Sequence, residues 1–204
     1  MRSFIEGGGA WLQVDMSDVQ RKISLLQSVL TEKQMERLLH RTFKEVGNKS
    51  GVLIAREAYK EYQVTQKWVK DQVRGYRLTY GGTGAVTCTI PLSSHKGTIG
   101  GRFKAYKLQK RISTDIVKKG GRSRLPEVMK NQGGNPPFVG GGKLGGVVFT
   151  RRTEERLPIV RVVGLGVPQM PLNRASDETQ EALLKYAGER LDHNFDHMFV
   201  RGGK

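Results

Sequence analysis

Apolar residues recur at helical spacing along the first third of the chain. In residues 17–30 they fall at Val19, Ile23, Leu26 and Leu30, which predicts an amphipathic helix. A second helix is expected to follow Thr31 as its cap, with an apolar stripe formed by Met35, Leu38, Leu39, Phe43 and Val46. The segment "GNKSG" interrupts it, and helical spacing resumes over residues 52–62. Because glycine costs about 1 kcal/mol in a helix interior, we predict one long helix with a weak centre.

Beyond a short basic helix expected from about Thr65 to Val73, the pattern changes to alternation. Residues 76–93 alternate around a glycine turn and predict a β-hairpin. Residues 101–109 alternate as well, and residues 112–128 predict a strand and a basic turn. Apolar bursts around 146–150 and 157–163 flank the charged run "TRRTEER", which predicts a second, extended hairpin over about 146–164.

The chain ends in a helical pattern that begins at Ser176 or Asp177 as its cap, with acidic residues in its first turn. Its apolar positions are Leu183, Leu184, Ala187, Leu191, Phe195, Met198 and Phe199. Helices, then strands, then one helix predict an α+β fold with an antiparallel sheet and a C-terminal amphipathic helix. A length of 204 residues suits one domain, 17–204, preceded by a flexible arm, 1–16, and containing a basic, glycine-rich insertion over about 96–145.

Charge is the most informative feature of the composition. The formal net charge is +16, and residues 101–161 hold 15 Lys and Arg against 4 acids, a net +11. Such a field attracts polyanions or an acidic protein partner. Phe103 and Tyr106 are interleaved with cations, as on surfaces that follow a nucleic-acid backbone, although a solvated hairpin face has the same pattern.

Residues that would support catalysis or metal binding are not arranged in a known motif. "GGTGAV" and "GGGKLGG" lack the Lys-Ser/Thr and the helix of a phosphate loop, and Pro168 blocks a helix after "GLG". His193 and His197 have zinc-pair spacing, but Asn194 stands where a zincin has Glu, so an exposed helical face is the better interpretation. Cys88 alternates with polar residues and is expected to be buried. The sequence therefore predicts no enzyme, metal or cofactor.

The cysteine content and the hydropathy limit the cellular compartments in which the protein is expected. A single cysteine excludes an internal disulfide and fits a reducing compartment. No apolar run approaches the roughly 18 residues of a membrane span, and the first residues lack the pattern of a signal peptide. Neither a membrane nor a small-molecule substrate is expected as a partner.

Several short motifs, in order and spacing, resemble the prophage minor tail protein Z family over about residues 16–200. The matching positions are Gln66, Lys67 and Val69, Phe138 and Val139, Gly146, Phe149 and Arg151, Arg156 to Ile159, and Pro168 with Met170. The glycine-rich start at 7–9 and the "GNKSG" break depart from the family pattern.

The resemblance implies a non-enzymatic structural component of a tailed bacteriophage with a tail-completion fold. Such a protein would form a ring, expected to be a hexamer, at the head-proximal end of the tail and help head–tail joining around the DNA channel. Its partners would be copies of itself, other tail or connector proteins, and phage DNA by non-specific contact. It would reside in the virion, and in the host cytoplasm during assembly. The alternative is a non-specific nucleic-acid-binding protein of ribosomal or nucleoid type.

Two groups of residues would carry this function. The cations expected to face the channel or an acidic partner are Arg102, Lys104, Lys107, Lys110, Arg111, Lys118, Lys119, Arg122 and Arg124. The hairpin residues expected to contact a neighbouring subunit are Val147, Val148, Phe149, Arg151, Arg152, Arg156, Leu157, Pro158 and Ile159. The alternative for the second group is an ordinary hairpin packed on its own subunit.

Overall fold

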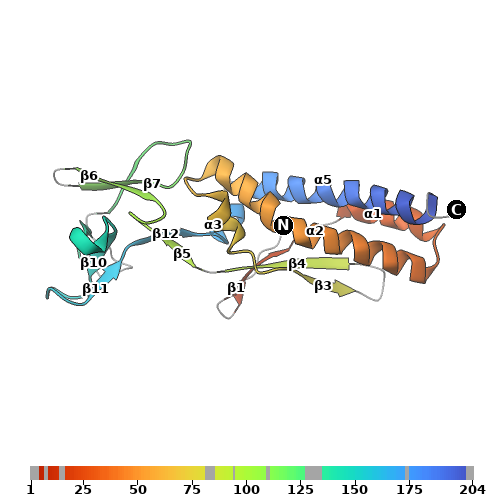
Figure 1. Cartoon of the computed structure of the whole chain (residues 1–204), viewed down its shortest axis with the longest axis horizontal. Helices are drawn as coiled ribbons and strands as arrows, with labels where there is room; N and C mark the ends of the chain where they lie inside the picture. Colours follow the sequence, from red (N-terminus) through yellow and green to blue (C-terminus); the bar gives the residue numbers. More distant parts are fainter. Residues whose placement is uncertain are drawn as a thin grey trace.

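The computed structural model is elongated, with helices gathered toward one end and short strands toward the other (Figure 1). It describes residues 5–6, 9–13, 17–80, 86–93, 95–108, 111–126, 135–172 and 175–200. We call the helices together with the sheet beneath them the helical body, and residues 96–166, which form strands β5 to β12, the β-rich end.

The fold is α+β, as the sequence predicts. The helices are α1 (Ser17–Gln27), α2 (Glu32–Glu61), α3 (Gln66–Lys70), α4 (Gln169–Leu172) and α5 (Ser176–Phe195), with a 3-10 turn η2 (Gly142–Leu144) and a π-helical continuation η3 (Asp196–Val200). Helix α2 begins after Thr31, whose backbone N–H donates to Gln34 Oε1 at 3.0 Å, so the predicted cap is confirmed. The N-cap of α5 is Ala175, so the expectation of Ser176 or Asp177 is wrong by one or two positions.

The strands form four small antiparallel sheets rather than one. They are β1 (Ile5–Glu6), β2 (Gly9–Gln13), β3 (Arg77–Tyr80), β4 (Val86–Leu92), β5 (Lys96–Thr98), β6 (Lys104–Leu108), β7 (Arg111–Asp115), β8 (Ser123–Arg124), β9 (Phe138–Val139), β10 (Val148–Arg151), β11 (Ile159–Arg161) and β12 (Val163–Gly166). Their orders are β1-β2-β4-β3, β11-β10-β9, β12-β5 and β6-β7-β8. Both predicted hairpins are confirmed, as β3–β4 and β10–β11.

Parts of the expected arm and insertion form strands. Within the expected flexible arm, β2 pairs with β4, so residues 9–13 belong to the sheet of the helical body. Within the expected insertion, β6 and β7 lie where the sequence predicts strands, and two further strands, β5 and β9, pair with β12 and β10. Strands β5 and β9 have three and two residues, which is too short for alternation to be recognised.

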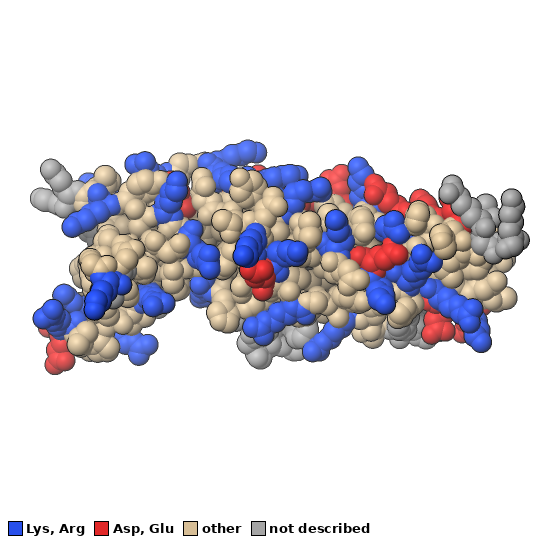
Figure 2. Space-filling view, in the orientation of Figure 1, with Lys and Arg blue, Asp and Glu red and all other residues tan. Residues whose placement is uncertain are grey.

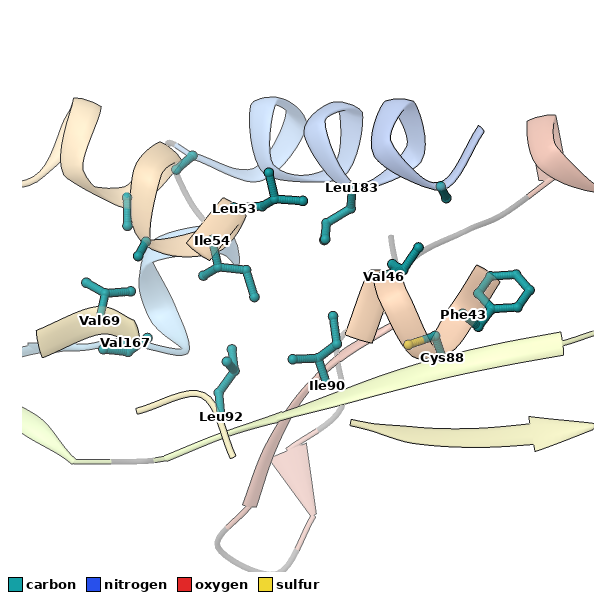
Figure 3. Packing of buried hydrophobic residues seen from close by; sticks show 14 of the residues in the cluster. Phe43, Val46, Leu53, Ile54, Val69, Cys88, Ile90, Leu92, Val167 and Leu183 are labelled. Carbon is teal, nitrogen blue, oxygen red and sulfur yellow. The ribbon is translucent and has the colours of Figure 1, made fainter. Parts of the chain in front are cut away.

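One apolar core joins the helices to the sheet beneath them. Helix α2 lies between α5 and β4, and Leu183, Ile54 and Ile90 come from these three layers (Figure 3). Ile54 is fully buried and Ile90 is 1% exposed. Cys88 on β4 is also buried, as predicted, and burial raises the pKa of its thiol to about 11. This thiol is therefore a core side chain and not a nucleophile.

Helix α2 runs without interruption through the "GNKSG" segment. A Cβ atom at Gly47 would overlap the ring of Tyr76, which packs directly on the helix backbone. Gly51 is different, since a Cβ there would meet Val73 at 3.5 Å, an ordinary contact. Gly47 is thus required because Tyr76, in the segment that leads into β3, packs against the helix at this position. The predicted weak centre of α2 is therefore the place where this segment contacts the helix.

Polar contacts hold α5 antiparallel against α2 (Figure 1). The Arg190 guanidinium forms a close ion pair with the Glu45 carboxylate, which also accepts from Asn194 Nδ2 at 3.5 Å. Partial burial raises the pKa of Glu45, but the hydrogen bond and charge of Arg190, with Asn194 and Arg41, hold it below its usual range overall. Glu45 is therefore ionised at neutral pH and contributes to the α2–α5 contact.

Candidate interaction site at the β-rich end

The sheet β6-β7-β8 covers a second, smaller core with one of its faces. Lys107 is paired with Ile112 and Ala105 with Thr114, so these four residues share that face. Ile112 is 8% exposed and clusters with Ile99, Val148 and Val162, and Leu125 packs against the cluster. The neighbouring positions in each strand must then project from the opposite face.

That opposite face carries a small polar unit around Tyr106. The Tyr106 hydroxyl donates to Asp115 Oδ2 at 2.6 Å, and the Arg122 guanidinium lies 3.7 Å from the centre of the ring. The hydrogen bond to Asp115 raises the pKa of Tyr106, because loss of the phenolic proton would set two negative charges side by side. Asp115 thus fixes the Tyr106 hydroxyl, and the Tyr106 ring lies under the Arg122 guanidinium.

Three of the predicted cations lie where the β-rich end meets the helical body. The Lys118 ammonium is 3.3 Å from the centre of the Tyr59 ring, and Lys119 Nζ is 3.6 Å from Glu61 Oε1. The Arg102 guanidinium lies 5.8 Å from the centre of the Trp68 ring. Lys118 is half-buried and serves the junction with α2, which sequence reasoning did not anticipate.

Four of the remaining predicted cations, Lys104, Lys107, Arg111 and Arg124, occupy exposed positions on the sheet, and the exposed Arg122 directly precedes β8. Lys110 lies outside the described residues. Blue Lys and Arg atoms are spread over the whole visible face, including the β-rich end, whereas most red atoms lie over the helices (Figure 2). The structure therefore gathers the sheet cations on one end of an elongated molecule.

The β10–β11 hairpin is buried along most of β10, half-buried at Ile159 and Val160 of β11, and exposed at its turn. Val148 is fully buried and Phe149 is 6% exposed, with its ring stacked on Phe138 at 6.1 Å between centres. These two residues pack within their own chain, which corrects the expectation that they contact a neighbour. Val147 and Ile159 are half-buried. The exposed residues of the predicted set are Arg151, Arg152, Arg156, Leu157 and Pro158.

Asn135 fixes the base of this turn. Its side-chain Nδ2 donates to the carbonyl oxygens of Arg151 and Thr153, at 3.0 Å each. Thr150 Oγ1 donates to the Asn135 carbonyl at 2.8 Å, and the Arg152 N–H donates to the Pro158 carbonyl at 3.3 Å. The turn is therefore closed by the hydrogen bond between its two ends, Arg152 and Pro158, and is also fixed by Asn135, which precedes β9.

A groove of about 420 Å³ separates the end of the β6–β7 hairpin from β9. Its apolar lining comprises Leu108, Ile112, Leu125, Pro126, Pro136, Pro137, Phe138 and Val139. Its charged lining comprises Lys107, Arg111 and Arg124. Among the described residues, this lining combines apolar walls with three cations and offers no hydroxyl, thiol, imidazole or carboxylate.

The other candidates from the sequence do not form a site. His193 and His197 are both exposed, as predicted, with ring centres 6.4 Å apart. In the described part of the chain, no group of three or more His, Cys, Asp or Glu is placed to hold a metal ion. Within the same residues, no helix has the length and apolar character needed to cross a bilayer.

Comparisons of the chain with protein-family models, with curated proteins and with solved structures return no match. Function must therefore be argued from the β-rich end itself.

Two components of this end were not expected from the sequence. The "NPPF" segment supplies Asn135 to the turn and Pro136, Pro137 and Phe138 to the groove. Asn before Pro is a known turn signal, but the neighbouring residues do not indicate that the Asn135 side chain binds the β10–β11 turn. On α2, Tyr59 and Glu61 contact Lys118 and Lys119, and the helical spacing of residues 52–62 does not indicate these contacts.

Proposed function

We propose that the protein is a structural component of a tailed bacteriophage, a minor tail or tail-completion protein. It would assemble as a ring at the head-proximal end of the tail and take part in head–tail joining around the DNA channel. The observation that carries the proposal is that one end of an elongated subunit combines exposed cations with a rigidly held, exposed hairpin turn. Such an end can face a polyanion or acidic neighbour while the helical body supports it.

The positions of the sequence motifs support this proposal. The motif residues Phe138 and Val139 form β9, and Phe149 and Arg151 lie in β10. The "RLPI" motif leads from the exposed turn into β11. Three groups of motif positions therefore meet at the hairpin, whereas Gln66 to Val69 lie in α3 and Met170 lies in α4. A tail-completion-like fold is part of the same proposal.

A non-specific nucleic-acid-binding protein is the second candidate. It is favoured by the exposed cations of the β6-β7-β8 sheet, since Lys and Arg contacts to phosphate need no sequence reading. In that case affinity for DNA should fall steeply with salt, and the subunit should remain monomeric or dimeric.

Light scattering of the purified, nuclease-treated protein at low and high salt separates the two candidates. A discrete ring-sized species that persists at high salt supports the tail component. A monomer that gains mass only when DNA is added supports the nucleic-acid-binding protein and contradicts the ring.

Charge reversal tests the same proposal in assembly. We expect Arg102→Glu with Lys104→Glu to reduce infectious particles in a phage complementation assay, because both side chains are exposed cations of the β-rich end. Circular dichroism of the variant should match that of the unmodified protein. Normal titres from a folded variant would contradict a role for these cations.

A further inference from the structure

The exposed turn and the groove are built on one short segment. Asn135 binds the turn through the Arg151 and Thr153 carbonyls, and Pro136 to Val139 continue directly into the groove wall. Arg151 reinforces the connection, with its guanidinium 5.3 Å from the centre of the Phe138 ring. The turn and the groove are thus fixed relative to each other within a subunit.

The turn differs in chemistry from its surroundings. Between the hydrogen-bonded residues Arg152 and Pro158 it comprises Thr153, Glu154, Glu155, Arg156 and Leu157, all exposed. Of the four acidic residues in the strongly basic stretch 101–161, two stand in this turn. Leu157 is 64% exposed, so the turn also presents a large apolar side chain. Red and blue atoms meet where the hairpin projects at the edge of the molecule (Figure 2).

The groove offers the complementary chemistry. Lys107 and Arg111 are exposed at its rim, and Leu108 beside them is 49% exposed. Prolines 126, 136 and 137 and Phe138 provide apolar walls. Glu154 and Glu155 give the turn two adjacent carboxylates, and Leu157 beyond Arg156 gives it an apolar side chain. The turn can therefore satisfy both the cations and these walls.

We propose that the turn Thr153–Leu157 of one copy of this chain docks in the groove of a second copy. Glu154 and Glu155 face Lys107 and Arg111, and Leu157 contacts the apolar wall. The turn is exposed in its own subunit, so it does not occupy its own groove. Because turn and groove are different surfaces, the contact is head-to-tail, and its repetition gives a closed ring or an open filament. The inference rests on the proposed ring and names the surfaces that join its subunits.

Two charge-reversal variants test this contact. The turn variant is E154K with E155K, and the groove variant is K107E with R111E. Each should weaken self-association by about tenfold or more, because like charges then face each other across the contact. Mass is measured by light scattering over a concentration series after nuclease treatment. Matched controls on the exposed face of α2, E32K with E36K and K33E with R37E, change net charge equally and should leave the mass unchanged.

Mixing the two variants gives the decisive result. The lysines in the turn variant's turn can bind the acidic groove of the groove variant. The unmodified turn of the groove variant can in the same way bind the unmodified groove of the turn variant. An equimolar mixture should therefore recover the mass of the original assembly with alternating copies, which also shows that both variants are folded.

The opposite results separate the inference from the ring proposal. Variants that assemble as well as the unmodified protein would overturn the turn–groove contact and leave the ring in place. Single variants that fail to assemble and are not rescued by mixing would overturn it as well. An unmodified protein that stays monomeric at every concentration would overturn both the ring and the contact.

Discussion

The helical body and the β-rich end differ in how much apolar surface they bury and in how much charge they expose. Among the described residues, the body contains one large cluster that links α2, α5 and β4, whereas the second cluster, in the β-rich end, comprises only Ile99, Ile112, Val148 and Val162. The segment 101–161, which makes up most of that end, also carries a net charge of +11. A small core beneath a repelling surface contributes little stability of its own, so the β-rich end depends on its attachment to the body.

The largest expected effects come from truncating each core in turn. Ile54→Ala removes a fully buried side chain from the centre of the body and should reduce the free energy of unfolding by about 2–5 kcal/mol. Val148→Ala at the β-rich end should reduce it by about 1–3 kcal/mol, because fewer methyl groups are lost from a smaller cluster. Urea unfolding followed by circular dichroism measures both.

Hydrogen exchange shows whether the two regions open separately. Val148→Ala should accelerate exchange of the amides of β9 and β10 while those of α5 stay protected, since local opening follows local burial. Ile54→Ala should lower protection in both regions. Equal loss of protection across the whole chain in both variants would show one cooperative unit and remove the distinction between body and end.

The next effect on stability concerns the contact between α2 and Tyr76, in the segment that leads into β3. Gly47→Ala should destabilise the protein by about 1–3 kcal/mol, even though alanine favours a helix, because its methyl group overlaps the Tyr76 ring. Gly51→Ala is the matched control on the same helix, and it should be neutral or stabilising by up to about 1 kcal/mol. The melting temperatures of the two variants are compared with that of the unmodified protein. A higher melting temperature for Gly47→Ala would contradict the close packing of Tyr76.

This pair of glycines also shows where sequence reasoning stops. The periodicity of Leu53, Ile54 and Ala58 predicted the helix correctly, because a helix leaves its spacing in the sequence. Gly47 is needed because the Tyr76 ring, 29 positions later in the chain, packs against it. Helix propensity depends on local sequence and cannot predict such a contact. The same limit applied to the site: alternation located β6 and an apolar burst located β10, but the groove depends on Pro136 and Phe138 meeting β6 and β7 through space.

A smaller effect tests the α2–α5 contact. Arg190→Met should cost about 1–2 kcal/mol at neutral pH, because it leaves the Glu45 carboxylate without its close partner. The folded pKa of Glu45 lies below its usual 4.5, so the pair stabilises the protein above that pH and its contribution disappears as the pH falls through the folded pKa. The stability difference between the variant and the unmodified protein should therefore shrink in acid.

The pair Lys22–Asp192 provides the control for that measurement. It joins α1 to α5 at 2.8 Å, but both side chains are more than half exposed. Lys22→Met should change stability by less than about 0.5 kcal/mol at any pH. A difference for Arg190→Met that does not depend on pH would show that packing, and not the charge of Glu45, holds the helices together.

The smallest effect belongs to the polar unit of the β-rich end and is spectroscopic. Asp115→Asn removes the carboxylate that accepts from the Tyr106 hydroxyl, so the raised pKa of Tyr106 should fall toward its ordinary value. Ultraviolet titration measures this shift, and Tyr106→Phe identifies which phenol is responsible. Because the ring is stacked under Arg122 on the surface, neither change should unfold the helical body. If Asp115→Asn left the titration unchanged, the carboxylate would not set the environment of Tyr106, and the surface position of Arg122 would have to rest on the ring alone.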